Sequence, residues 1–213
     1  MTVIAIPTGR SYGECVEILL GAGLPAEALQ SAGRNLVVDQ GRYRYLLGKP
    51  SDIPTLISQG VAELALVGSD VIGESEVELT ELFDTDRGRC FLAVAGPESV
   101  AERFGGHTSA LMGLKVGTTY VKTARRTFES WGAQIKVLKL NGSVELAPAL
   151  GVADCIFDVV QTGGTLRANG LTIIKRASDV SLRLVASSAA LQLRWRELRE
   201  TVEAIRRYIL RGA

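Results

Sequence analysis

The stretch CIFDVVQTGGTLRANG, residues 155–170, decides the fold class of this chain. Its apolar first part, CIFDVV (155–160), is typical of a buried strand, and TLRANG (165–170) is typical of a short helix. The two are joined by TGGT (162–165), in which two glycines are flanked by threonines. A buried strand that leads through a glycine turn into a helix is a building unit of α/β folds.

The same alternation of strand and helix patterns extends through the rest of the chain. Further strands are expected at residues 2–6, 34–39, 42–48, 63–68, 89–96, 115–120, 135–140, 171–176 and 180–187. Further helices are expected at residues 12–22, 51–60, 121–132, 143–151 and 189–210. Segment 77–83 fits either a short helix or an extended connector. This alternation predicts an α/β fold with largely parallel sheets.

The last expected helix, 189–210, has the clearest periodic pattern. Its apolar residues recur every three or four positions, and they are Leu191, Trp195, Leu198, Val202, Ile205 and Ile209. Such a stripe predicts a helix that packs on the protein core. A docking seam for a partner subunit is the alternative interpretation.

The composition argues against two classes of partner. Lys and Arg number 24 against 23 Asp and Glu, so the chain lacks the basic excess that is typical of nucleic-acid-binding proteins. No segment approaches the roughly 18 consecutive apolar residues of a membrane span. The N-terminal sequence MTVIAIPTGRSYG also lacks the pattern of a signal peptide. We therefore expect a soluble, cytoplasmic protein that binds neither nucleic acid nor membrane.

The cysteines and the histidine do not suggest a metal site or a nucleophilic triad. Cys15, Cys90 and Cys155 are widely spaced and form no C-x-x-C motif, which predicts reduced, buried thiols. The single histidine, His107, lies in the polar stretch GGHTS and is expected in a loop. Because Ser-His-Asp and Cys-His mechanisms would have to use this one residue, both are disfavoured.

The TGGT turn has the composition of an anion-binding loop. Glycines allow successive backbone N–H groups to point into one concavity, and Thr162 and Thr165 can add hydroxyl donors. Asp158, four residues before the turn, would repel a phosphate but can accept hydrogen bonds from two ribose hydroxyls. The pattern predicts a phosphate-plus-ribose site, and a tight turn with a threonine cap is the alternative. Neither a Walker loop nor G-x-G-x-x-G is present.

The longer segment NGSVELAPALGVADCIFDVVQTGGTLRANGL (141–171) closely resembles the ATP phosphoribosyltransferase family of histidine biosynthesis. The resemblance covers nearly the whole chain. It continues in AIPTGR (5–10), SDIPTLISQGVAELALVGSDVI (51–72), RCFLAVAG (89–96) and KVGTTYVKTARRTF (115–128). Because the chain stops soon after helix 189–210, it looks like the family's short form, which lacks the C-terminal regulatory domain.

The resemblance implies a reaction and a fold. N1 of ATP would attack the anomeric carbon of phosphoribosyl pyrophosphate (PRPP), and pyrophosphate would leave with the help of substrate-bound Mg²⁺. The implied fold is two-lobed and similar to type II periplasmic binding proteins, with a ligand cleft between the lobes. Residues 1–88 and 181–213 would form the first lobe, and 89–180 the second, which carries the PRPP loop. The implied partners are further copies of the chain and a regulatory subunit similar to histidyl-tRNA synthetase.

The resemblance also implies roles for individual residues. Arg10 and Arg34 would act on the pyrophosphate as catalytic residues, and Asp70 and Tyr120 would contact ATP. The implied PRPP-binding residues are Glu145, Asp154, Asp158, Thr162, Gly163, Gly164 and Thr165. The residue types alone also allow structural interpretations: solvated surface arginines, a Glu145 that favours a helix dipole, an Asp154 at the entry of a strand, and a Tyr120 in the core.

Four positions depart from the family's pattern. Thr8, Ser69 and Thr119 stand where the family often has lysine, and Val121 stands where it often has proline. The remaining candidate cations are Arg10, Arg34, Lys122, Arg125 and Arg126. The loss of lysines supports two alternative functions: a non-catalytic ligand-binding or regulatory module on the same fold, and another PRPP-dependent transferase.

Overall fold

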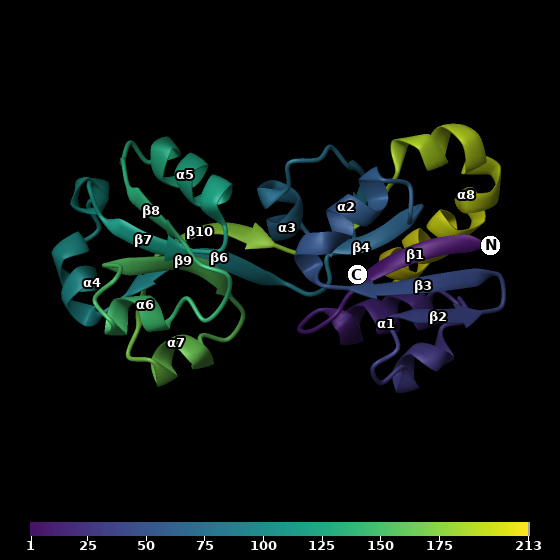
Figure 1. Cartoon of the computed structure of the whole chain (residues 1–213), viewed down its shortest axis with the longest axis horizontal. Helices are drawn as coiled ribbons and strands as arrows, with labels where there is room; N and C mark the ends of the chain where they lie inside the picture. Colours follow the sequence, from purple (N-terminus) through teal and green to yellow (C-terminus); the bar gives the residue numbers. More distant parts are fainter. Residues whose placement is uncertain (213) are drawn as a thin grey trace. The chain divides into compact units, whose positions relative to one another are not determined.

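The computed structural model describes residues 1–212 and divides the chain into two compact units. The first comprises Met1–Gly88 together with the chain from Ser181 onward, and the second comprises Arg89–Val180. Each unit is built around its own β-sheet with helices on both faces, so the α/β class is confirmed (Figure 1). None of the helices within residues 1–212 is long and apolar enough to cross a membrane.

The first unit has a six-stranded mixed sheet. The strand order is β2-β3-β1-β4-β11-β5. The strands are β1 (Thr2–Pro7), β2 (Val37–Gln40), β3 (Tyr43–Gly48), β4 (Leu64–Gly68), β5 (Thr80–Asp84) and β11 (Leu182–Ala186). The three strands β1, β3 and β4 are parallel, whereas β2, β11 and β5 pair antiparallel with their neighbours. The expected hairpin between β2 and β3 is confirmed, and Gly41 takes a φ of 60° in its turn.

Helices cover both faces of this sheet because successive residues of its strands point to opposite faces. Ile4 and Ile6 of β1 pack with α1 (Tyr12–Gly21) and α8 (Ser188–Arg211), whereas Ala5 packs with α2 (Ile53–Ser58). The short helix α3 (Ser69–Glu74) follows β4. Short 3-10 turns, η1 (Glu27–Ser31) and η2 (Pro50–Asp52), complete the unit.

The C-terminal helix packs on the core, as its apolar stripe predicted. Its buried stripe residues are Leu198, Val202, Ile205 and Ile209. Trp195 departs from the prediction, since 39% of its surface is exposed. Trp195 directly follows a kink in the helix, where Arg194 has non-helical angles (φ −129°, ψ 15°).

The second unit has a five-stranded mixed sheet in the order β10-β6-β9-β7-β8. The strands are β6 (Cys90–Gly96), β7 (Lys115–Thr118), β8 (Lys136–Lys139), β9 (Cys155–Val160) and β10 (Thr172–Val180). The three strands β7, β8 and β9 are parallel, and β6 pairs antiparallel with both of its neighbours, β9 and β10. Two helices, α4 (Glu98–Phe104) and α5 (Val121–Ser130), pack on one face, whereas α6 (Leu146–Ala149) and α7 (Gly164–Ala168) lie on the other.

Three sequence expectations need correction. The sheets are mixed rather than largely parallel, because β2 and β11 in the first unit and β6 in the second run antiparallel to the strands beside them. Segment 77–83 is extended, as one of its two interpretations had it, but from Thr80 onward it forms a paired strand, β5, beside β11 at the edge of the sheet. The strand expected at 171–176 continues to Val180, since an edge position tolerates the polar residues that obscured its pattern.

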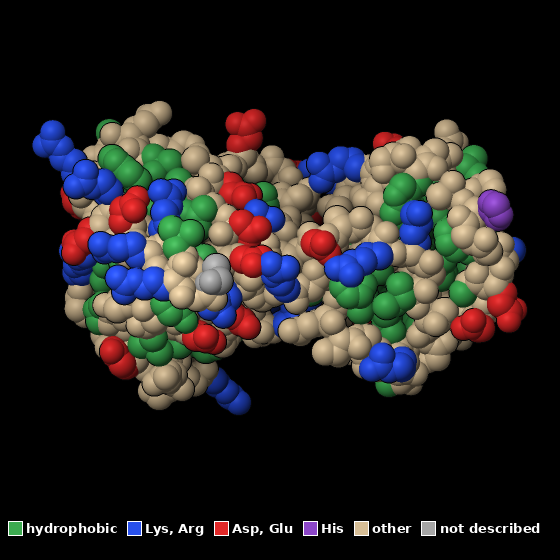
Figure 2. Space-filling view, turned by 180° about the vertical axis from the view of Figure 1, so that it is seen from behind, with side chains coloured by type: hydrophobic (Ala, Val, Ile, Leu, Met, Phe, Trp, Pro, Cys, Tyr) green, Lys and Arg blue, Asp and Glu red, His purple; other side chains and the backbone are tan. Residues whose placement is uncertain are grey.

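The expectations for the cysteines and the histidine are confirmed. Cys15, Cys90 and Cys155 are buried and form no disulfide. Burial raises the pKa of the Cys155 thiol to about 12, with a smaller contribution from the nearby Asp154 carboxylate. His107 is exposed and precedes a 3-10 turn, η3 (Thr108–Leu111). It lies at the surface, at the right edge of Figure 2.

Candidate active site

The carboxyl ends of three parallel strands meet at one edge of the second unit. The pairings Val116–Cys155 and Lys115–Lys136 fix β7, β8 and β9 in the same direction. Each of these strands leads through a turn into a helix, namely α5, α6 or α7. Ligands of open α/β sheets bind at such an edge because loops and helix starts converge there. Tyr120, Glu145 and the TGGT turn all follow these strand ends.

The TGGT turn exposes backbone N–H groups that the chain itself does not use. Gly163 has a φ of 71° in the left-handed region, which a glycine adopts without the steric cost of a side chain. Within residues 1–212, the amides of Thr162, Gly163 and Thr165 have no hydrogen-bond acceptor. The Gly164 amide makes only a long contact of 3.4 Å to Thr162 Oγ1. The turn can therefore offer several donors to an anion.

A cation that the sequence analysis did not single out lies beside this turn. The Nη1 atom of Arg167 donates to the carbonyl of Thr162 at 3.3 Å, and the backbone N–H of Arg167 donates to the carbonyl of Gly163 at 3.1 Å. The helix period predicts this proximity, because Arg167 stands four residues after Gly163. Its guanidinium adds positive charge at the turn.

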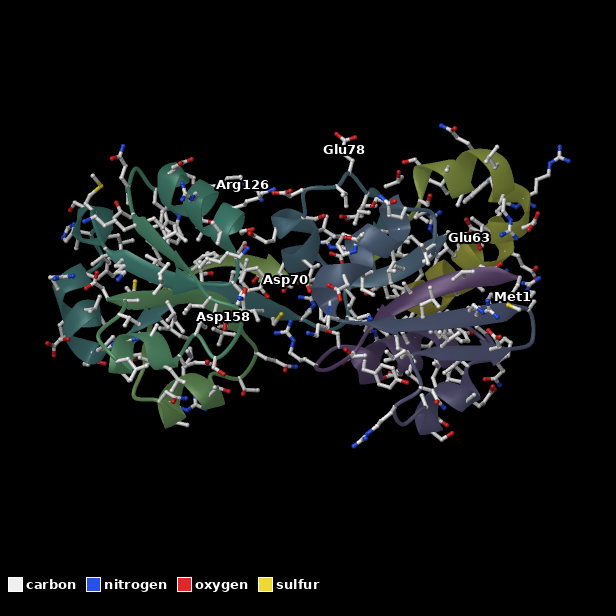
Figure 3. The ribbon with its side chains drawn as sticks, viewed as in Figure 1. Met1, Glu63, Asp70, Glu78, Arg126 and Asp158 are labelled. Atoms are coloured by element: carbon white, nitrogen blue, oxygen red, sulfur yellow. The ribbon has the colours of Figure 1, made fainter. Side chains whose placement is uncertain are left out.

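Asp158 lies on the same face and toward the same edge of the sheet as the turn. Side chains alternate along a strand, so Asp158 shares its face with Ile156 and Val160. These two residues belong to the hydrophobic cluster that contains Leu166 of α7. Asp158 is half-buried, pairs across the sheet with Ala93, and is labelled on its strand in Figure 3. A carboxylate here can accept hydrogen bonds from hydroxyls of a group whose phosphate occupies the turn.

Two other carboxylates proposed for the PRPP site have different positions. Glu145 is half-buried directly before α6, at the carboxyl end of β8, so it shares the edge with the turn. The structure does not place Asp154 there. Its Oδ2 atom accepts from the backbone N–H of Lys115 at 2.7 Å, and its own N–H donates to the Lys115 carbonyl at 2.8 Å. Asp154 thus ties the amino ends of β7 and β9 together, at the far end of β9 from the turn.

Tyr120 follows β7 and directly precedes α5. Its ring is half-buried and packs against the cluster that contains Phe128 and Phe157. Its backbone N–H donates to Thr118 Oγ1 at 2.8 Å. Tyr120 is thus partly a core aromatic and partly available at the edge. Arg126, one of the remaining candidate cations, lies on the following helix, α5, and is labelled in Figure 3.

The first unit has an equivalent edge. Arg10 follows β1, and Asp70 follows β4 in the first turn of α3. Arg34 precedes β2, and because β2 runs antiparallel to β3 it emerges at the same edge. Arg10 and Arg34 are exposed and make no ion pair within residues 1–212, while Asp70 is buried. Lys49, directly after β3, is a further exposed cation that the sequence analysis missed.

Two of the departures from the family's pattern have structural roles. The hydroxyl and the backbone N–H of Thr8 both donate to the carbonyl of Gly48, at 3.1 Å and 2.7 Å, and so join the ends of β1 and β3. The hydroxyl of Ser69 accepts from the backbone N–H of Ser181 at 3.3 Å. These short side chains are engaged locally, in contrast to a lysine that would extend beyond the edge.

Comparison with known proteins identifies the family. The sequence profile described as ATP phosphoribosyltransferase matches residues 49–207. An ATP phosphoribosyltransferase of Rubrobacter xylanophilus is 38% identical over 207 residues, covering 96% of this chain and 94% of the relative. One of Caldicellulosiruptor saccharolyticus is 37% identical over 213 residues, covering 99% of this chain and 100% of the relative.

Solved structures agree with this result. A chain of the ATP phosphoribosyl transferase (HisG:HisZ) complex from Thermotoga maritima superposes with a TM-score of 0.80 at 26% identity, covering 99% of this chain and 100% of that one. The periplasmic aliphatic sulphonate binding protein SsuA from Escherichia coli superposes with a TM-score of 0.61 at 10% identity, covering 98% and 72%. The second likeness confirms the periplasmic-binding-protein-like fold. The profile match and the close relatives show that this chain belongs to the ATP phosphoribosyltransferase family.

Proposed function

We propose that this chain transfers the phosphoribosyl group of PRPP to N1 of ATP and releases pyrophosphate, the first step of histidine biosynthesis. The observation that carries the proposal is the TGGT turn. Its backbone N–H groups that have no acceptor within residues 1–212 lie on the same sheet face and edge as Asp158. That combination suits a ligand with a phosphate and a sugar, as PRPP has. Family membership over most of the chain supports the same reaction.

PRPP would be held by the turn and the strand before it. The amides of Thr162, Gly163 and Thr165 would donate to the 5′-phosphate, and the guanidinium of Arg167 would balance its charge. Gly164 allows the phosphate to approach the backbone closely. Asp158 would accept from the ribose hydroxyls. Glu145, at the end of the neighbouring strand, is the second carboxylate in reach of the sugar, whereas Asp154 is not proposed as a ligand.

The chemistry requires charge stabilisation more than proton transfer. Adenine N1 carries a free lone pair, so the attack needs no strong general base. Negative charge develops on the leaving pyrophosphate, and preorganised donors stabilise such charge most effectively. We assign this role to the guanidinium groups of Arg10 and Arg34. Tyr120 would stack on the adenine, and Asp70 would accept a hydrogen bond from ATP.

Magnesium would reach the reaction bound to its substrate. No cluster of three or more His, Cys, Asp or Glu side chains that could hold a metal occurs within residues 1–212. Mg²⁺ commonly binds through phosphate oxygens and water, with few protein ligands. When bound to PRPP, it would neutralise charge on the leaving pyrophosphate. The residues of this chain would then bind and orient the metal–substrate complex.

The chain would act in the cytoplasm as part of a larger assembly. Its length matches the relatives over nearly their full extent, which fits the short form of the enzyme. The Thermotoga structure is a complex of two different proteins. We therefore propose a homo-oligomer that also binds a regulatory subunit similar to histidyl-tRNA synthetase.

The test is a direct assay of the reaction. The full chain is incubated with ATP, PRPP and Mg²⁺, with and without the synthetase-like subunit. Mass spectrometry should detect phosphoribosyl-ATP, and a coupled assay should detect pyrophosphate in equal amount. Binding of PRPP without turnover in both mixtures would instead indicate a non-catalytic binding module. Pyrophosphate release only with a different acceptor would indicate another PRPP-dependent transferase.

A further inference from the structure

Thr118, the last residue of β7, has a buried hydroxyl group with two hydrogen bonds. The residue has no exposed surface. Its Oγ1 atom donates to the carbonyl of Phe157 on β9 at 2.6 Å and accepts from the backbone N–H of Tyr120 at 2.8 Å. Both partners adjoin or belong to the candidate site, since Phe157 precedes Asp158 and Tyr120 leads into α5.

The hydroxyl acts where the backbone pairing of the two strands stops. The parallel pairing of β7 with β9 covers Val116–Cys155 and Gly117–Ile156 and goes no further. On its other side, β7 stays paired with β8 through Thr118, while β9 stays paired with β6 through Val160. The two central strands therefore separate just before Asp158, and the side chain of Thr118 bridges them at that point.

We propose that Thr118 is a positioning residue for the proposed reaction. It fixes the carbonyl of Phe157 and thereby the backbone from which the Asp158 carboxylate projects. The same oxygen fixes the amide of Tyr120 and thereby the turn at the start of α5. One hydroxyl thus couples the group that would hold the ribose to the residue that would hold the adenine. This inference rests on the proposed function.

The first unit contains a similar arrangement, at a threonine to which no ligand contact is assigned. Thr85 is 1% exposed, its Oγ1 donates to the carbonyl of Leu182 at 2.8 Å, and it accepts from the backbone N–H of Arg87 at 3.3 Å. Loss of the Thr85 hydroxyl leaves the Arg87 amide to find another acceptor, whereas the Leu182 carbonyl keeps the backbone N–H of Thr85 as a donor at 3.0 Å. Thr85→Val therefore reports the structural cost of losing a buried threonine hydroxyl at a residue to which no ligand contact is assigned.

The test compares Thr118→Val, Thr118→Ser and Thr85→Val in the full chain with its regulatory subunit. Each variant is measured for its melting temperature, for the Kd of PRPP by calorimetry, and for kcat and KM. Both valine variants should lower the melting temperature. Only Thr118→Val should reduce kcat/KM for PRPP, by about 10-fold to 100-fold, the scale of a small misplacement of a reacting group. Thr118→Ser, which keeps the hydroxyl, should restore most of this loss.

Two results would overturn the proposal: an unchanged kcat/KM and Kd for PRPP in Thr118→Val, or equal losses in Thr118→Val and Thr85→Val. If Thr118→Val does not fold, Thr118→Ala is measured in its place and the same loss is expected. Failure of the proposed function is a separate outcome, because it appears as absence of phosphoribosyl-ATP with the unmodified chain. The Kd of PRPP then still tests whether Thr118 positions the ribose site.

Discussion

Substitutions at two adjacent glycines of the TGGT turn should have different effects on stability but similar effects on PRPP binding. Gly163 has a φ of 71°, so an alanine there costs about 1–2 kcal/mol of folding free energy. Its Cβ would also lie 3.2 Å from Arg167 Nη1, the far end of a flexible side chain that can move. Gly164 lacks a positive φ, and its Cβ would meet only Thr162 Oγ1, at an ordinary 3.6 Å. Gly164→Ala should therefore leave the free energy of unfolding unchanged, or raise it by about 0.4–1 kcal/mol.

Both substitutions should nevertheless weaken PRPP binding. Gly163→Ala disturbs the direction of the amides, and Gly164→Ala puts a methyl group beside the Thr162 hydroxyl, where we place the phosphate. Loss of one hydrogen bond to a charged group is worth about 1.5–3 kcal/mol. That free energy corresponds to a Kd for PRPP that is about 10-fold to 150-fold higher.

The assay combines urea denaturation with calorimetric titration of Mg²⁺-PRPP. Gly170→Ala is the matched control for strain, because Gly170 follows α7 with a φ of 67° and has no neighbouring atom within 4 Å of an added Cβ. It should lower the unfolding free energy as Gly163→Ala does, yet leave PRPP binding intact. If Gly163→Ala and Gly164→Ala both bind PRPP like the unmodified chain, the turn does not hold the phosphate and our assignment is wrong.

Three further predictions concern catalysis, stability and pH. Arg10→Ala should lower kcat by about 100-fold to 1,000-fold with little change in melting temperature, because one preorganised donor to the leaving group is lost; steady-state assays with an unchanged kcat would remove Arg10 from the mechanism. Glu63 accepts from the Val3 amide at 2.9 Å and pairs with Arg194 at the kink of α8, as its position in Figure 3 illustrates. Glu63→Ala should therefore lower the unfolding free energy by about 3 kcal/mol, whereas Glu197→Ala, which removes the exposed second partner of Arg194, should change it little. Burial raises the pKa of Cys155 to about 12, above the unfolded pKa near 9, so the folded state favours the neutral thiol. The resulting contribution to the stability of the folded state is present below pH 9 and is lost as the pH rises toward 12. The stability difference between the unmodified chain and Cys155→Ala should thus shrink above pH 9 in urea titrations, and a constant difference would contradict the assignment.

Local patterns in the sequence determined the elements around the site. The apolar run CIFDVV and the glycines of TGGT specify a strand, a left-handed turn and a helix, because each depends on residues close together in the chain. The apolar stripe of α8 likewise predicted which face of the helix is buried, but it did not predict the kink at Arg194. The family resemblance rested on the same local motifs.

Tertiary structure alone decided which polar groups come together. Asp154 and Asp158 are four residues apart and share a sheet face, but an extended strand separates them by about 13 Å. Only the pairing of β9 with β7 shows that Asp154 is bonded to Lys115 while Asp158 lies toward the turn. The role of Thr118 was also invisible in sequence, because its partner Phe157 is 39 residues away. Strand register and the point where two strands separate depend on contacts between distant segments, and no local pattern encodes them.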